Sequence, residues 1–86
     1  MRTIWKFELE IADDPQTVEM PQGAEIVHVA AQNGVLCFWA IVEPSSPKEP
    51  RSFIVHGTGH PIGNVVRTYR GTALMRPFVW HVFEIL

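Results

Sequence analysis

This 86-residue chain lacks several features, and each absence narrows its architecture. A single cysteine, Cys37, rules out an intramolecular disulfide framework, and its apolar neighbours predict a buried thiol. No apolar run approaches the ~20 residues of a membrane span, and the first residues lack the apolar core of a signal peptide. We therefore expect a soluble, intracellular protein.

Acidic residues are absent between Pro50 and Phe83, a stretch of 34 residues that carries four arginines. The formal net charge of −2 hides this division. Residues 1–50 hold eight acids and three bases, a net −5, whereas residues 51–86 hold four arginines and one acid, a net +3. Such segregation predicts a dipolar surface, unless strands from the two halves interleave in space and cancel it.

Convincing amphipathic helical stripes are also missing, and short strand patterns take their place. Residues 5–11 alternate apolar and charged side chains, and Asn33-Gly34 is a strong type I′ hairpin signal. Three prolines predict a stiffened surface loop over residues 44–50. The expected strands are 5–11, 17–20, 26–32, 35–42, 52–56, 64–74 with a bend at Gly71, and 78–86.

Six to seven short strands with regularly spaced turn signals predict an all-β fold. We expect a small antiparallel barrel or a sandwich, in one domain that covers residues 1–86. Residues 61–69 are the one segment for which a short helix is an alternative. A core this small also favours self-association, so a homo-oligomer is expected.

The glycine-rich segment 57–63, Gly-Thr-Gly-His-Pro-Ile-Gly, is the most suggestive motif. Consecutive backbone N–H groups of Gly57, Thr58 and Gly59 are able to form a nest for a phosphate or carboxylate, and His60 adds a side-chain donor. The segment is not a P-loop, because no Lys-Ser/Thr pair follows. A plain turn that needs positive φ is the alternative.

Arg67, Tyr69 and Arg70 extend this candidate site. Guanidinium groups suit bidentate contacts with phosphate, and an aromatic ring suits stacking on a nucleobase. In a strand, Arg67 and Tyr69 share one face and Arg70 lies on the other. The alternative is ordinary: solvated arginines and core aromatics on alternating faces.

Histidine is frequent, with four residues, but none has metal-ligand spacing with cysteine or carboxylate, so we predict neither a metal nor a cofactor. His81, between apolar neighbours, is predicted to be a hydrogen-bonded core residue. No catalytic constellation is evident, because the acid-free half removes an acidic partner from the loop's own segment. An acid from the first half is still able to reach the loop. We therefore predict a protein that is not an enzyme.

Six segments of the sequence form a recognisable pattern: Ile-Trp-Lys-Phe (4–7), Met-Pro-Gln-Gly-Ala-Glu-Ile (20–26), Gln-Asn-Gly (32–34), Phe-Trp-Ala (38–40), Gly-Thr-Gly-His-Pro-Ile (57–62) and Val-Trp-His-Val-Phe-Glu (79–84). In this pattern the chain resembles a family of small phage and prophage proteins of unknown function. The resemblance covers nearly the whole chain and implies a virus-encoded accessory protein that acts in the bacterial host cytoplasm. It transfers no activity to any residue.

Three functions remain open from the sequence. The first is a non-catalytic counter-defence protein that sequesters an anionic, nucleotide-type immune signal. The second is an inhibitor of a host defence protein that docks through the acids Glu8, Glu10, Asp13 and Asp14, in the manner of a nucleic-acid mimic. The third, single-stranded nucleic-acid binding, fits the net negative charge least well.

Overall fold

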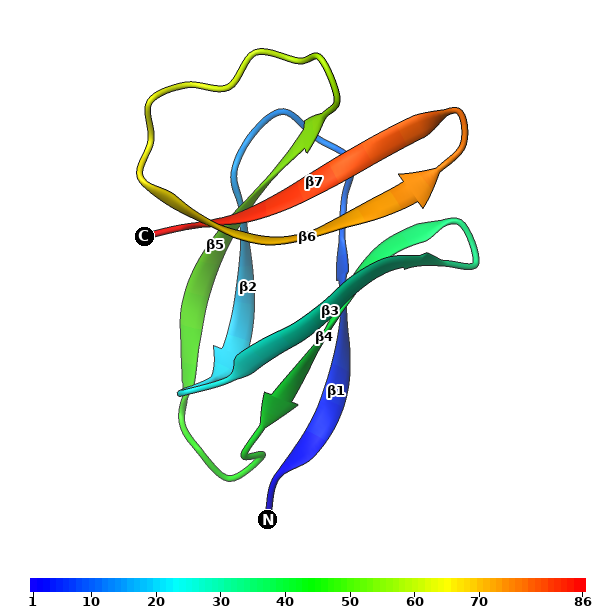
Figure 1. Ribbon diagram of the computed structural model, residues 1–86. Coiled ribbons are helices and arrows are strands. Elements are labelled where there is room, and N and C mark those ends of the chain that lie inside the picture. Colours follow the sequence, from blue (N-terminus) through cyan, green and yellow to red (C-terminus); the bar gives the residue numbers. More distant parts are fainter.

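Seven antiparallel β-strands and no helix make up the computed structural model, which describes residues 1–86 (Figure 1). They form a three-stranded sheet in the order β1-β4-β3 and a four-stranded sheet in the order β2-β5-β7-β6. The sheets are not closed into a barrel, so the all-β prediction is confirmed in its sandwich form. The strands are β1 (Thr3–Leu9), β2 (Gln16–Pro21), β3 (Glu25–Gln32), β4 (Val35–Val42), β5 (Lys48–Gly57), β6 (Arg67–Met75) and β7 (Phe78–Ile85).

The core lies between the two sheets and is centred on aromatic rings. Phe38 on β4 stacks on Phe7 of β1 at 5.1 Å between ring centroids, and it meets Phe53 of β5, on the other sheet, at 4.9 Å. Alternation explains this, since every second residue of a strand faces the same side. β4 is the central strand of its sheet and is buried on its core face; on the outer face Cys37 is buried, whereas Val35, Trp39 and Ile41 are partly exposed.

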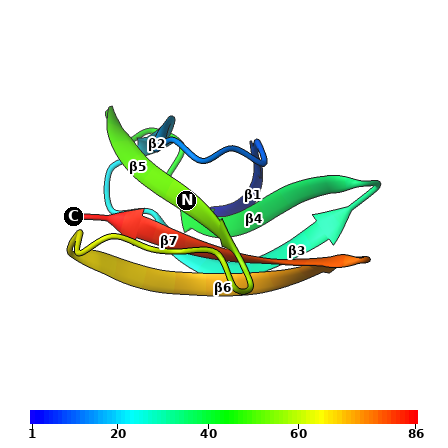
Figure 2. The ribbon, with the colours of Figure 1, turned by 90° about the horizontal axis from the view of Figure 1, so that it is seen from above.

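The β3–β4 turn and the bend in β6 follow the sequence expectations. Asn33 and Gly34 both have positive φ, 52° and 78°, as a type I′ hairpin requires. At Gly71 a β-bulge shifts the register of β6 against β7. A Cβ on Gly71 would lie 2.6 Å from the Cβ of Val29, so the glycine allows β6 to pack directly against β3, as Figure 2 shows.

The helix considered for residues 61–69 is absent, so that alternative is wrong. Residues 58–66 form a loop, and β6 begins at Arg67. Two causes favour the extended chain. Val65 and Val66 are β-branched, and the Arg67 guanidinium binds the carbonyl oxygens of Gly63 and Val65, which a helix would need for its own hydrogen bonds.

The proline-rich segment 44–50 is a loop only in its first part, because β5 already begins at Lys48. Pro50 lies opposite Glu19 of β2. A proline is tolerated there when its ring nitrogen occupies a position that donates no hydrogen bond to β2. The four-stranded sheet therefore mixes β2 from the acidic half with β5, β6 and β7, and the two halves interleave in space.

Two connections meet at one end of the sandwich, at the top of Figure 1: the segment between β1 and β2 and the loop 58–66. The candidate site lies at this end.

Candidate functional site

The Gly57–His60 segment forms a tight turn, and the turn occupies the Thr58 amide, the middle one of the three on which an anion nest would depend. The N–H of Thr58 donates to the carbonyl of Val79 at 3.2 Å, and the N–H of His60 donates to the carbonyl of Gly57 at 3.1 Å. Only Gly59 has positive φ, 86°. The geometry therefore supports the turn interpretation of these backbone groups, and the nest of consecutive free amides is not present.

Gly57 is required for a different reason, which is close packing. A Cβ at this position would lie 2.7 Å from the His60 ring and 3.0 Å from the Trp80 ring. The missing side chain lets His60 sit edge-on to Trp80, with ring centroids 6.0 Å apart. The absence of a side chain at Gly57 thus leaves the space that the His60 ring occupies.

Arg67 holds the loop against the outer face of the four-stranded sheet. Its guanidinium donates to the carbonyl oxygens of Val65, at 2.9 Å, and Gly63, and its Nη1 lies 3.1 Å from Nε2 of His56. It also stacks over the Phe83 ring at 5.7 Å. These contacts use three of the five N–H donors of the guanidinium and hold the Arg67 side chain against the loop and the sheet.

His56 must be neutral for the contact with Arg67. Arginine only donates, so Nε2 of His56 accepts and the ring proton is on Nδ1. Burial lowers the pKa of His56, and the positive charge of Arg67 lowers it further.

Arg70 faces the opposite side of β6, as the alternation predicted, and its side chain is partly buried. Its guanidinium binds Glu84 at 2.7 Å, and Arg51 binds the same carboxylate at 2.6 Å. Hydrogen bonds from Arg51, first, and from Arg70 hold the pKa of Glu84 below its usual value. The structure therefore separates Arg70 from the glycine-rich loop.

Sequence reasoning missed this buried network, although a signal was present. Glu84 is the one acid after residue 49, and it shares a strand face with Trp80 and Val82. An acid on the core side of a strand needs a buried cationic partner.

Tyr69 lies on the outer face in a chain of hydroxyl and imidazole contacts. Its hydroxyl lies 2.5 Å from the Thr72 hydroxyl, which lies 3.0 Å from Nδ1 of His81. Nε2 of His81 lies 2.7 Å from the Thr58 hydroxyl. His81 is therefore hydrogen-bonded, as predicted, but half-buried on the outer face rather than in the core.

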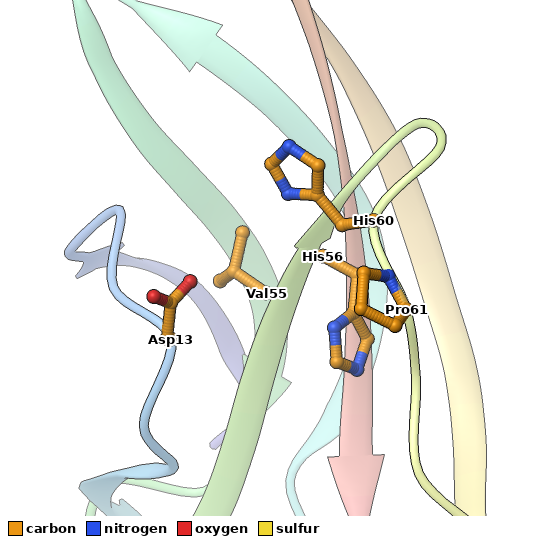
Figure 3. A pocket seen from close by; sticks show the side chains of 5 residues that line it. All are labelled: Asp13, Val55, His56, His60 and Pro61. Carbon is orange, nitrogen blue, oxygen red and sulfur yellow. The ribbon is translucent and has the colours of Figure 1, made fainter.

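Two hollows flank His60, and its side chain forms part of the wall of both. The first, which we call the edge hollow, measures about 370 Å³ and lies beside β5 (Figure 3). The second, the aromatic slot, measures about 280 Å³. The edge hollow is lined by Asp13, Val55, His56, His60 and Pro61, and the aromatic slot by Gly57, Thr58, His60, Pro77, Phe78, Val79 and Trp80.

Of the predicted site residues, the structure thus gathers Gly57, Thr58 and His60, with Gly59 at the exposed tip of their turn. Arg67, Tyr69 and Arg70 line neither hollow. The acid that reaches the loop from the first half is Asp13, and its carboxylate points toward β5 in Figure 3.

Arg76 is the arginine of the second half that the protein leaves free. It is exposed and takes part in no hydrogen bond or ion pair, whereas Arg51 and Arg70 bind Glu84 and Arg67 binds the loop. It directly precedes Pro77, which lines the aromatic slot.

The structure contains no group of three or more histidine, cysteine or acidic side chains arranged to hold a metal ion. It also contains no helix with the length and apolar character to cross a membrane.

Comparison with known proteins gives a family but no activity. Residues 1–85 match the family described as "Domain of unknown function (DUF7352)". No curated protein and no solved structure matches the chain. Because the family match spans almost the whole chain, this protein belongs to the DUF7352 family of uncharacterised domains.

Proposed function

We propose that this protein binds an anionic ligand with a flat aromatic ring, most simply a nucleotide, in the aromatic slot, and that it does so without transforming it. One observation carries the proposal: the slot contains two aromatic side chains, and the unpaired Arg76 directly precedes its lining residue Pro77 in the chain. In this proposal Arg76, rather than Arg67 or Arg70, neutralises the charge of the ligand. Phe78 and Trp80, rather than Tyr69, stack on its ring.

The contacts inside the slot support a ligand of this kind. Phe78 and Trp80 lie 5.6 Å apart between ring centroids, and Phe78 is 57% exposed. Stacking of a base on such a ring stabilises a complex by roughly 1–3 kcal/mol. The Thr58 hydroxyl and the His60 ring supply polar contacts, and the Arg76 guanidinium is suited to a phosphate.

Binding without turnover is supported by the ionisable groups of the slot. Among its lining residues only His60 is ionisable, and no carboxylate is present. General acid–base catalysis usually depends on a positioned partner for such a group. A slot with this lining is suited to holding its ligand.

A counter-defence role in a bacterial host is the biological setting that we propose. It rests on the resemblance to phage and prophage proteins together with the slot. A protein that sequesters a nucleotide immune signal needs tight binding and no catalysis. Assembly as a homo-oligomer is supported by an exposed apolar edge, where the N–H of Leu86 donates to the carbonyl of Val66 and both side chains are more than 70% exposed.

Calorimetric titration with a panel of cyclic and linear nucleotides tests the proposal. We expect at least one nucleotide to bind, and we expect Trp80→Leu or Arg76→Ala to weaken binding roughly ten-fold or more. Gly57→Ala should weaken binding as well, because it displaces the His60 ring. The matched control is Arg2→Ala, which removes an exposed arginine far from the slot. Absence of binding across the whole panel would refute the proposal.

A second candidate is the inhibitor of a host defence protein. The observation that favours it is that the acids Glu8, Glu10, Asp13 and Asp14 form no ion pair, so their charge is uncompensated. Reversal of these four charges should abolish stoichiometric capture of a host protein while leaving nucleotide binding intact. Capture that survives the charge reversal would exclude this candidate.

A further inference from the structure

The free edge of β5 is the feature that goes beyond the proposed function. β2 begins at Gln16, opposite Phe53, so the last part of β5 has a strand partner only on its other side, in β7. The edge hollow lies on this open side, next to Val55. The segment between β1 and β2 passes beside it and carries Asp13 (Figure 3).

Hydrogen-bond alternation determines which main-chain groups of β5 face the open side. The N–H of Thr58 donates to Val79, so in the antiparallel pair of β5 and β7 the residues that exchange bonds are His56 with His81 and Ile54 with Phe83. The N–H and C=O of Val55 therefore point away from β7.

Two other features agree with this assignment. The N–H of Leu86 donates to the carbonyl of Val66, so the main-chain groups of even-numbered residues at this end of the chain face β6. The main-chain groups of the odd-numbered residues of β7 therefore face β5. Pro50, which has no N–H, lies at an even-numbered position of β5, where the main-chain groups point away from β2, so no hydrogen bond to β2 is lost.

Val55 is 3% exposed, and no side chain or loop backbone group bonds to its N–H or C=O. Buried main-chain groups are nearly always paired. The unpaired N–H and C=O of Val55, which lie beside the hollow, are therefore available to bond to a strand of a partner. An antiparallel strand residue opposite Val55 would exchange two hydrogen bonds with it.

Charge decides the chemistry of that partner. The Asp13 carboxylate lines the hollow, and Glu10 and Asp14 lie on the same segment, with no ion pair to any of the three. The segment is held in shape by Gln16, whose side chain accepts from the N–H of Glu10 at 2.9 Å and donates to its C=O at 2.8 Å. The segment that carries the Asp13 carboxylate is therefore held in shape before a partner binds.

We propose that the edge hollow is a docking site for an extended peptide segment of a partner protein, which adds to β5 as a strand opposite Val55 and presents a lysine or arginine to Asp13. Main-chain bonds to an exposed sheet edge supply affinity in this mode of recognition, and side-chain contacts supply specificity. The site is distinct from the aromatic slot, although His60 borders both.

The test uses blocked hexapeptides in which valine alternates with lysine, with glutamate or with threonine, added to the isotope-labelled protein. We expect the lysine peptide to bind best and to slow hydrogen exchange of the Val55 amide about ten-fold or more. The same peptide with N-methylated main-chain groups on its bonding edge should not bind. Asp13→Asn should weaken binding about ten-fold, and the adjacent control Asp14→Asn should weaken it less.

Three results would overturn the proposal: no binding by any of the peptides, equal binding of the N-methylated peptide, or an unchanged Val55 amide when the lysine peptide binds. Protection of Val55 that appears without peptide and grows with protein concentration would assign the edge to a second copy of the chain instead. Nucleotide titration of Asp13→Asn separates the two sites, because binding in the aromatic slot does not depend on this carboxylate.

Discussion

The buried carboxylate of Glu84 offers the sharpest prediction about stability. Its oxygens accept from Arg51 at 2.6 and 2.8 Å and from Arg70 at 2.7 and 3.0 Å. The side chain of Glu84 is 7% exposed, and those of Arg51 and Arg70 are 14% and 28% exposed. Arg51 also donates to the carbonyl of Ala24 at 2.6 Å, so the network ties the turn between β2 and β3 to both β5 and β7.

Glu84→Gln removes the charge with little change in shape and leaves two guanidinium groups facing one neutral amide. Breaking a buried ion pair by removing one partner costs about 3–5 kcal/mol. Glutamine keeps one acceptor oxygen, so we expect the lower end of that range. For a domain of this length the total free energy of unfolding is about 4–13 kcal/mol, and the melting temperature should fall by roughly 12–24 °C.

Urea unfolding followed by tryptophan fluorescence near neutral pH measures this loss. The control is Glu19→Gln, an exposed acid of β2 without an ion pair, which should change the free energy of unfolding by no more than about 0.5 kcal/mol. A loss below about 1 kcal/mol for Glu84→Gln, or an equal loss in the control, would refute the reasoning.

Acid titration gives an independent check on the same residue. The folded-state pKa of Glu84 is lowered, mainly by hydrogen bonds from Arg51. Its contribution to stability is therefore present above the unfolded pKa of about 4.5 and lost as the pH falls through the folded value. In Glu84→Gln, this part of the pH dependence should disappear.

The remaining predictions concern the packing of glycines and the contact between Arg67 and His56. Gly71→Ala should destabilise the fold by roughly 1–3 kcal/mol in thermal or urea unfolding, because the new Cβ would meet Val29, and it should cost less in a Val29→Gly background. His56 has a lowered pKa, so its contribution to stability is present above about pH 6.5 and falls as the pH drops through that value toward the folded pKa. Urea midpoints measured from pH 7.5 to pH 5 should show this loss, and His56→Gln should flatten the profile; an unchanged profile would contradict the Arg67–His56 contact. Gly34→Ala should be destabilising, because φ of 78° disfavours a side chain, whereas Gly63→Ala, which has neither positive φ nor a close neighbour, should be nearly neutral in the same assay.

Local patterns were sufficient for the parts of the fold that depend on neighbours in the chain. Alternation located β1, although about two residues too late in the chain, and Asn33-Gly34 located the hairpin of β3 and β4, because side-chain direction and turn geometry are local properties. The start of β5 was misjudged because three prolines suggest a loop, and only pairing with β2 shows that Pro50 needs no donor there.

The candidate site depended far more on tertiary structure. The sequence singled out the turn at Gly57–His60 and the arginines near it, but the roles of those arginines follow from which partners the fold brings to them. Arg67 and Arg70 are occupied because Gly63 and Val65 fold back over one face and Glu84 lies across the other.

The sequence by itself determined the all-β class, the β3–β4 hairpin, the bend at Gly71 and the opposite faces of Tyr69 and Arg70, since these follow from local backbone preferences and a period of two. Tertiary structure alone decided that His60 stands between two hollows, that Asp13 reaches one of them and that Arg76 is the arginine left free. The physical reason is that hydrogen bonds and charge pairing between distant strands, which no local pattern encodes, assign each polar group its partner.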